Sequence, residues 1–308
     1  MDYHSNYLTQ RDTAVNSCVA KYNIAYIAYY DLSRNTAATE HISRVIEELS
    51  SRGNNVRIFR PECSVKSIAA GIDEFILPAE NAAAFDKLVS RAIDKIQQKI
   101  DIIYVRDFMC LSQVVNWAKR KNIPIIIEHN GLYHAEVPLI HNWKSKILFL
   151  YEKVSTLRKR IGLADINIVV TPAIGEFYAL KYGIPREKFI HIPNGVDIER
   201  FKPARDKTAL REKLGLLPTD ALWMGYAGSM YPWHMLDNFI EGFELFSQER
   251  DDVRLFIGGD GDERAKIEQL VVNSPAASKI MVKSPLKITE SAEYIAAFDL
   301  GIALMNPR

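Results

Sequence analysis

Strand-like and helix-like segments alternate along most of this chain of 308 residues, and no other feature restricts the fold as strongly. Tyr22 to Tyr30 (YNIAYIAYY) is a dense run of β-branched and aromatic residues, which is typical of a buried strand. Thr36 to Arg52 then places Ile42, Ile46 and Leu49 on one helical face. Repeated strand–helix alternation favours a parallel sheet covered by helices on both faces, so the sequence predicts an α/β fold.

The alternation occurs in two series, which suggests two domains. The first series predicts strands at 56–59, 72–77, 101–105, 124–128, 165–170 and 188–192, with helices at 82–99, 110–121, 144–160 and 172–182. The second predicts strands at 223–227, 253–257, 279–282 and 299–304. It also predicts a short helix that ends at 214 and three further helices at 236–246, 263–271 and 290–297. We divide the chain into a leader expected to be disordered (1–20), a first domain (21–193), a hinge (194–207) and a second domain (208–308).

Most of the hinge lies in the stretch Ile190 to Pro203 (IHIPNGVDIERFKP). It carries two turn signals, Pro193 and the pair Asn194-Gly195, and it stops at a second proline. Ligand sites form preferentially where two domains meet. We therefore expect a ligand to bind between the two halves.

Composition excludes several classes of protein. The net charge of +1 provides no overall attraction to nucleic acid or to an anionic membrane. Cys18, Cys63 and Cys110 are scattered without metal-binding spacing, which is typical of reduced thiols in a reducing compartment. No apolar run is long enough to span a bilayer, and the polar first twenty residues do not resemble a signal peptide. We expect a cytoplasmic protein that binds no nucleic acid.

Two stretches of the second half could bind an anion. Gly258-Gly259-Asp260-Gly261 lies at the end of a predicted strand and opens a helix, where backbone N–H groups can approach a ligand. The alternative is an ordinary tight turn.

The stretch GYAGSMYPWHMLD, residues 225–237, also leaves a strand end and offers the Ser229 hydroxyl, the Trp233 ring and the His234 imidazole. The alternative here is simple packing of the proline and tryptophan.

A third stretch, IIIEHNGLYHAEV at residues 125–137, crowds Glu128, His129 and Asn130 at a strand end of the first half. Strand alternation places Glu128 and Asn130 on one side of the sheet and His129 on the other. His134 follows in the loop. These residues lack the spacing of a recognised metal site, and we expect no bound metal.

The predicted helix Lys144 to Arg160 is strongly basic on one side and apolar on the other. A packed helix with a solvated basic face is the simpler interpretation. The alternative is peripheral contact with an anionic membrane surface or a lipid-linked substrate, at the cytoplasmic face of the membrane.

Several segments together resemble the retaining glycosyltransferases of family 4. They are ADINIVVT, KYGIPREKFIHIPNGVDIERFKP, GYAGSMYPWHMLDNFIEGF, VRLFIGGDGD and EYIAAFDLGIAL, and the resemblance runs from about Tyr22 to the end of the chain. It implies the GT-B fold, in which two Rossmann-like domains face each other across a cleft. The second domain then holds a nucleotide-sugar donor, the first binds the acceptor, and neither a metal nor a cofactor is needed.

The resemblance also implies roles for individual residues. On the donor side, Asn194 and Gly195 form the turn beneath the donor, and Gly228 and Ser229 face its diphosphate. His234 stands where many members have a lysine. Gly259, Asp260 and Gly261 border the nucleoside, and Lys283 borders the base. On the acceptor side, Asn130 or His129 positions the acceptor or the transferred sugar, with Glu128 and His134 beside them.

The sequence departs from the family pattern at several positions. Ser229 and His234 replace two cations that usually neutralise the leaving group. Asn130 aligns with the usual catalytic-loop histidine, and Ser33 to Thr36 replace a glycine pair. The Glu-x7-Glu motif, expected soon after Leu304, is not in the sequence. We therefore expect an incomplete second domain in a chain truncated at its carboxyl end.

The predicted function is transfer of a sugar, with retention, from a nucleotide diphosphate sugar to a hydroxyl of a sugar, lipid-linked or polysaccharide acceptor. Polysaccharide or glycolipid biosynthesis is the expected setting. The first alternative is an inactive, truncated remnant that only binds nucleotide sugars. A nucleotide-sugar epimerase on the same fold is the second alternative, because fold does not determine function.

Overall fold

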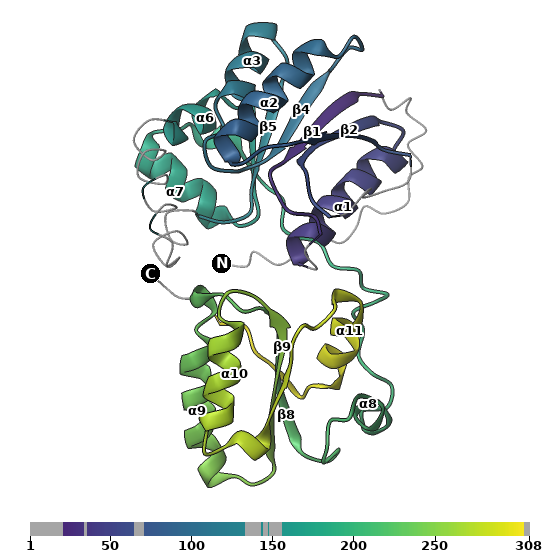
Figure 1. The fold of residues 1–308 in the computed structure, drawn as a ribbon, viewed down its shortest axis with the longest axis vertical. Helices are drawn as coiled ribbons and strands as arrows, with labels where there is room; N and C mark the ends of the chain where they lie inside the picture. The colour runs from purple at the N-terminus through teal and green to yellow at the C-terminus, as the bar shows by residue number, and fades with distance from the viewer. Residues whose placement is uncertain are drawn as a thin grey trace, which may run out of the picture.

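The structure is a computed structural model that describes residues 21–304, except 34–35, 65–70, 133–142, 144–146 and 148–155. Two α/β domains lie one above the other (Figure 1). The predicted leader (1–20) and most of the predicted basic helix (144–160) lie outside the described residues. The last residues of that helix belong to α6 (Leu157–Leu163).

The first domain contains a seven-stranded sheet in the order β3-β2-β1-β4-β5-β6-β7, and every neighbouring pair is parallel. Its strands are β1 (Asn23–Ala28), β2 (Asn55–Pro61), β3 (Asp73–Leu77), β4 (Ile102–Arg106), β5 (Ile125–His129), β6 (Ile166–Val169) and β7 (Phe189–His191). The strand order reverses between β1 and β4, as in a doubly wound fold.

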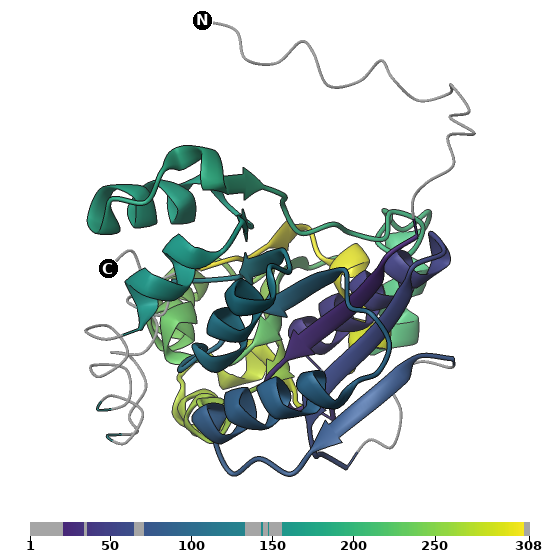
Figure 2. The same ribbon diagram turned by 90° about the horizontal axis from the view of Figure 1, so that it is seen from above.

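Helices cover both faces of this sheet (Figure 2). They are α1 (Ala37–Ser51), α2 (Ala82–Lys95), α3 (Gln113–Lys121), α6 and α7 (Pro172–Tyr182), with the short η2 (Arg186–Lys188). Side chains of β1 alternate between the two faces: Tyr26 packs with Ile42 of α1, whereas Ile27 packs with Phe85 of α2. Burial on both faces explains the continuous apolar run in β1.

The second domain contains a parallel four-stranded sheet in the order β10-β9-β8-β11. Its elements are α8 (Lys207–Leu214), β8 (Leu222–Ser229), η3 (Pro232–His234), α9 (Leu236–Glu249), β9 (Val253–Asp260), α10 (Arg264–Asn273), η4 (Ala277–Lys279), β10 (Ile280–Lys283), α11 (Ile288–Ala297) and β11 (Leu300–Gly301). Helices α9 and α10 cover one face, and α8 and α11 cover the other (Figure 1). The predicted α/β fold of two doubly wound domains is confirmed.

Strands β8, β9 and β11 of this sheet differ most in extent from the prediction, and β8 runs on to Ser229. Strand β9 continues through Gly258 to Asp260, where a turn was expected, because β8 and β9 remain paired as far as Ser229 opposite Asp260. Strand β11 is two residues long instead of six, and among the described residues it pairs with β8 alone.

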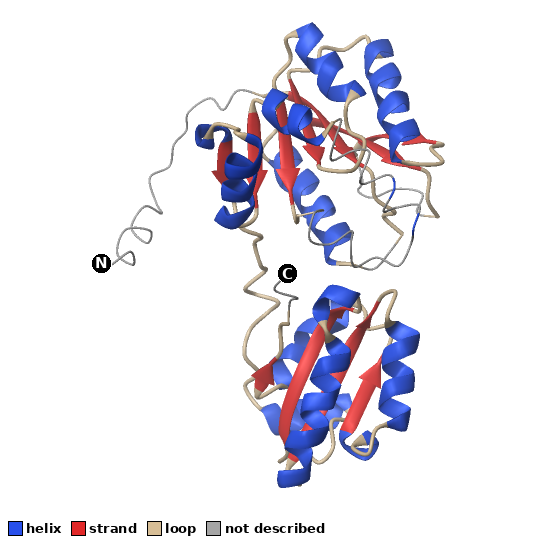
Figure 3. Ribbon diagram, turned by 90° about the vertical axis from the view of Figure 1, so that its left-hand side faces the viewer, coloured by secondary structure: helices blue, strands red, loops and turns tan. Residues whose placement is uncertain are grey.

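The two sheets present their carboxyl edges to each other. All strands of a parallel sheet end at one edge, and β7 leads from that edge into the connection that descends to the second domain (Figure 3). The chain that leaves the carboxyl end of β11 also lies between the domains (Figure 3). Loops at both edges are therefore placed where a ligand can meet both domains.

Helix α3 begins three residues later than predicted because a residue of α2 caps it. Ser112 occupies the N-cap position without a side-chain cap hydrogen bond. The buried Asp86 carboxylate instead accepts hydrogen bonds from the backbone N–H groups of Ser112, Gln113 and Val114 at 2.8, 2.6 and 3.0 Å. Burial raises the pKa of Asp86, and these hydrogen bonds act in the opposite direction.

Replacement of Asp86 by alanine is expected to lower the free energy of unfolding by about 1–3 kcal/mol, because buried N–H groups lose their acceptor. Urea denaturation followed by circular dichroism measures this change. Asp220→Ala is the matched control, since Asp220 is exposed and should alter stability little. Equal losses in both variants would show that the cap is unimportant.

Candidate functional site

Most of the predicted donor-side residues lie at the carboxyl ends of β8 and β9 and in the loops that follow, which pack directly against each other. Gly228 of β8 is opposite Gly259 of β9 in the sheet register. Gly259 has φ +148, and a Cβ atom there would overlap the carbonyl oxygen of Gly228. Gly261 has φ +156, and a Cβ there would overlap the carbonyl of Met230. These conformations and approaches require glycine.

Backbone hydrogen bonds hold these two loops together. The N–H of buried Met230 donates to the Asp260 carbonyl at 2.9 Å, and the Met230 carbonyl accepts from the N–H of Glu263 at 2.9 Å. The two glycine-containing stretches, about thirty residues apart in sequence, thus form one surface at the carboxyl edge. Gly228 and Asp260 are exposed on it, and Ser229 and Gly261 are partly exposed.

His234 connects this surface to the segment after β11. Its Nδ1 lies 3.2 Å from the carbonyl oxygen of Leu304, and its Nε2 lies 3.2 Å from Ser229 Oγ. A carbonyl can only accept, so Nδ1 donates, and Nε2 of the neutral ring accepts from the Ser229 hydroxyl. The Tyr226 hydroxyl donates to the Ser229 carbonyl at 2.5 Å, and burial raises the pKa of Tyr226.

Trp233 stacks on Tyr231 with ring centroids 4.6 Å apart, and it stays partly exposed. This contact agrees with the packing interpretation of the proline–tryptophan pair.

Ser284 and Arg264, which the sequence did not indicate, lie beside the residues predicted to border the nucleoside. The Ser284 hydroxyl donates to the Gly259 carbonyl at 2.7 Å, and Arg264 donates to the Ser284 carbonyl at 3.1 Å. Lys283 hydrogen-bonds Tyr294 Oη and pairs with Glu290, both at 3.0 Å, and these interactions raise its pKa. Ser284 follows β10 and Arg264 is the first residue of α10, and no local motif marks either of them.

The hinge residues Asn194 and Gly195 are exposed. Within the described part of the chain, the Asn194 side chain makes no hydrogen bond. No hydrogen bond among the described residues links the Asn194 side chain to the glycine-containing loops.

On the acceptor side, Glu128 is the centre of a buried cluster. Its carboxylate accepts hydrogen bonds from His41 of α1 at 2.5 Å, Asn130 Nδ2 at 2.7 Å and Tyr104 of β4 at 2.7 Å. Burial raises the pKa of Glu128, but the hydrogen bonds and the His41 charge dominate and lower it to about 2. Arg106 adds an ion-pair contact at 3.7 Å.

His129 points to the opposite side of β5, as the strand alternation predicted. It is fully buried, with Nδ1 2.9 Å from Asp107 Oδ2 and Nε2 3.0 Å from Asn167 Oδ1. Arg160 pairs with the other oxygen of Asp107 at 3.0 Å. Burial raises the pKa of Asp107, but the charges of Arg160 and His129 outweigh burial and lower it.

These two neighbours differ in exposure. His129 is enclosed by a buried ion-pair network, whereas Asn130 is partly exposed at the carboxyl edge. His134 lies outside the described residues. The partners of Glu128 and His129 come from distant elements, so no sequence pattern indicated them: His41, Tyr104, Arg106, Asp107, Arg160 and Asn167.

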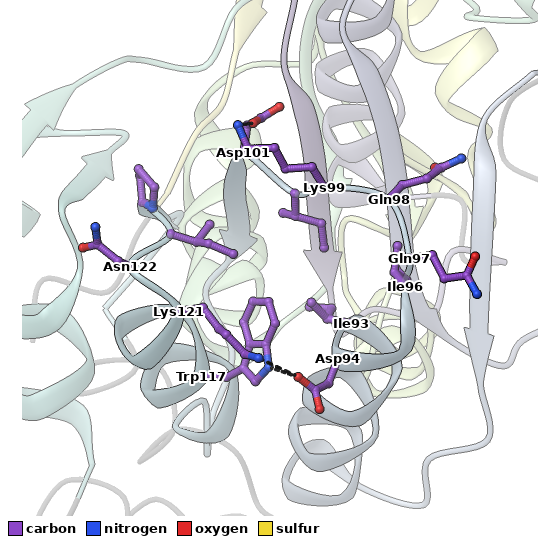
Figure 4. Close-up of a pocket in the computed structure, with 13 residues that line it drawn as sticks. Ile93, Asp94, Ile96, Gln97, Gln98, Lys99, Asp101, Trp117, Lys121 and Asn122 are labelled. Atoms are coloured by element: carbon purple, nitrogen blue, oxygen red, sulfur yellow. Dashed lines mark hydrogen bonds and ion pairs between the residues drawn. The ribbon is translucent and has the colours of Figure 1, made fainter.

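A pocket of about 550 Å³ lies at the other edge of the first sheet, between the ends of α2 and α3 (Figure 4). Asp94 accepts a hydrogen bond from Trp117 at 3.1 Å and pairs with Lys121 at 3.3 Å on its wall (Figure 4). It adjoins the amino ends of β4 and β5, and none of the predicted site residues lines it. Ligands of parallel α/β sheets bind at the carboxyl ends, so this pocket is separate from the candidate site.

Across the described residues, no group of three or more histidine, cysteine or acidic side chains is placed to hold a metal ion. None of the helices in the described ranges is long and apolar enough to cross a membrane.

Comparisons with known proteins address the family and the fold. Residues 38–200, more than half of the chain, match the family profile of Glycosyltransferase Family 4. D-inositol 3-phosphate glycosyltransferase of Geodermatophilus obscurus is 23% identical over 295 residues, covering 85% of this chain and 63% of that protein. The chain thus spans less than two thirds of the length of this relative.

Two solved structures share the architecture. Sucrose-phosphate synthase from Thermosynechococcus elongatus superposes with a TM-score of 0.69 at 17% identity, covering 92% of this chain and 75% of that one. Anabaena HepE in complex with UDP and glucose superposes with a TM-score of 0.68 at 14% identity, covering 92% and 74%. At these identities the likeness concerns the fold, which is that of two Rossmann-like domains.

Proposed function

Because this chain belongs to glycosyltransferase family 4, we propose that it transfers a sugar from a nucleotide diphosphate sugar to an acceptor hydroxyl, with retention of the anomeric configuration. The observation that carries this proposal is the interlocked glycine surface formed by Gly228, Gly259 and Gly261. It exposes backbone at the carboxyl edge of the second sheet, opposite the edge that carries Asn130. Backbone N–H groups at such an edge suit a diphosphate.

The donor diphosphate leaves with increased negative charge as its bond to the sugar breaks. Preorganised hydrogen-bond donors stabilise that charge better than reorganising water does. Ser229 and His234 supply two side-chain donors beside the glycine surface. When the diphosphate binds, the Ser229 hydroxyl turns from His234 Nε2 to a phosphate oxygen, and the freed nitrogen takes up a proton from solvent and donates it in a hydrogen bond to the diphosphate.

The remaining predicted residues complete the arrangement. Gly259 to Gly261 and Lys283 border the nucleoside, and the hinge turn at Asn194 and Gly195 lies beneath the donor. On the first domain, Asn130 contacts the acceptor or the transferred sugar, while His129 supports β5 from its buried side. Glu128 lies behind Asn130, and His134 belongs to the same acceptor side.

The acceptor is a sugar, a lipid-linked sugar or a polysaccharide end, in polysaccharide or glycolipid biosynthesis. The name of the Geodermatophilus relative specifies D-inositol 3-phosphate, and the HepE structure holds UDP and glucose. UDP-glucose and inositol 3-phosphate are therefore the first substrates to test. The basic segment 144–160 is proposed to bring the chain to an anionic membrane surface at the cytoplasmic side.

Replacement of His234 by alanine is expected to lower kcat/KM by about a hundredfold, because one preorganised donor to the leaving group is lost. Release of nucleoside diphosphate is measured over a panel of sugar nucleotides with several hydroxyl acceptors. His191→Ala is the matched control, since His191 is exposed at the end of β7 and lies outside the glycine surface.

Absence of turnover and of nucleotide binding in the unmodified chain, with every donor of the panel, rules out the proposed function. Nucleotide binding without transfer identifies a binding-only protein. Equal activity of the His234 and His191 variants removes His234 from the leaving-group site.

A further inference from the structure

The Asn130 side chain has one orientation that its neighbours allow. Its Nδ2 donates to Glu128 Oε1 at 2.7 Å. A flipped amide would instead place the carbonyl oxygen of Asn130 against the carboxylate, two acceptors facing each other. The hydrogen-bond network therefore distinguishes the two ends of an amide that are otherwise alike in shape.

Glu128 is itself held firmly enough to impose this choice. It is 2% exposed, and it receives a hydrogen bond from His41 of α1 and another from Tyr104 of β4. With its pKa lowered to about 2, the carboxylate remains ionised at any pH used for an assay. An ionised carboxylate only accepts, so it orients the Asn130 amide under all such conditions.

The consequence appears at the exposed end of Asn130. Its Oδ1 accepts no hydrogen bond within the described part of the chain, and the residue is partly exposed at the carboxyl edge. The Oδ1 end is thus an acceptor offered to a ligand, while one N–H of the same amide is used by Glu128. A sugar hydroxyl can donate to it, whereas a phosphate or carboxylate oxygen cannot.

We propose that Glu128 and His41 are positioning residues that orient Asn130, so that its Oδ1 accepts a hydrogen bond from a substrate sugar hydroxyl. This inference rests on the proposed glycosyltransferase function and extends it to two residues that do not themselves touch substrate. It also states the chemistry of the contact: the first domain selects a hydroxyl donor at this point and discriminates against a deoxy sugar.

The first test is a double-mutant cycle in the full chain. Glu128→Gln introduces an amide that can turn its NH2 toward Asn130 and so favours the flipped orientation. We expect Glu128→Gln and Asn130→Ala each to lower kcat/KM by about tenfold to a hundredfold, because a contact to the reacting sugar is misplaced. The double variant should be no worse than Asn130→Ala alone, since Glu128 acts through Asn130.

Matched controls separate these effects from general damage. Glu48→Gln changes an exposed carboxylate of α1, and Asn116→Ala changes an amide of α3 that is remote from the site. Both should retain the activity of the unmodified chain. UDP affinity, measured by calorimetry, should be unchanged in every variant because the glycine surface is intact. Multiplicative losses in the double variant, or full activity of Glu128→Gln, overturn the inference.

The second test needs no substrate, so it separates this inference from the proposed function. The side-chain amide signals of Asn130 are identified in labelled protein by their absence from Asn130→Ala. Glu128→Gln and His41→Ala should shift them, and Glu48→Gln should not. Unshifted Asn130 signals in Glu128→Gln overturn the inference even if the chain transfers sugar. If the unmodified chain has no turnover, the proposed function fails, and with it the contact to a sugar hydroxyl.

Discussion

Replacement of Gly259 by alanine is expected to weaken nucleotide binding by at least about a hundredfold, equivalent to about 2.7 kcal/mol. The added Cβ would overlap the carbonyl oxygen of Gly228, and φ +148 is a conformation that alanine rarely adopts. Because the obstacle is backbone of the paired strand, β8 and β9 must separate to relieve it. We expect a further loss of about 1–3 kcal/mol in the free energy of unfolding from the strained backbone.

Calorimetric titration with UDP and urea denaturation measure the two effects. Gly242→Ala is the matched control: Gly242 lies in α9, and an added Cβ there would meet no heavy atom within 4 Å. Alanine in a helix interior should be neutral or stabilising by up to about 1 kcal/mol. If Gly259→Ala binds UDP like the unmodified chain, the glycine surface is not the donor site.

Replacement of Asp107 by alanine is expected to lower the free energy of unfolding by about 3–5 kcal/mol, because the buried Arg160 guanidinium loses this carboxylate. Arg160 and His129 are 1% and 0% exposed, so water cannot replace the missing charge. Urea denaturation provides the measurement. Asp252→Ala, which removes an exposed pair with Arg250, should change stability little.

The Asp107 effect has a defined pH dependence. Its pKa in the folded chain lies below the ordinary value of 3.8. Its stabilising contribution is therefore fully present well above that value, and it is lost as pH falls through the folded pKa. The difference in stability between Asp107→Ala and the unmodified chain should shrink on acidification below about pH 4. A difference that is constant down to pH 2 would contradict an ionised Asp107.

Strand and helix periodicity predicted most elements of the fold because each element buries its own apolar pattern. It failed where a partner from another element sets a boundary. Asp86 of α2 decides where α3 starts, and no residue within α3 reveals this. Gly259 resembles a turn residue by composition, but pairing with β8 keeps it in a strand.

For the candidate site too, the sequence predicted features that depend on one strand and missed contacts between distant elements. Alternation along β5 correctly separated Glu128 and Asn130 from His129, because that pattern depends on one strand alone. The contribution of His41 was not predictable, since it is 87 residues away and approaches only when α1 packs on the sheet. The roles assigned to Asn130 and Ser229 remain predictions until the variants are assayed.

The connection between the domains is anchored at both ends. Before it, the Ile192 N–H donates to the Val169 carbonyl at 3.1 Å; after it, Lys207 Nζ donates to the Phe298 carbonyl at 2.7 Å. Between them, a turn at Asp197 is closed by a 2.8 Å hydrogen bond from the Phe201 N–H. This connection is short and partly ordered. It therefore acts as a tether that keeps the carboxyl edge of each sheet near the other, at an effective concentration on the order of millimolar or higher. In the proposed function, this tether holds a donor bound to the second domain close to an acceptor bound to the first.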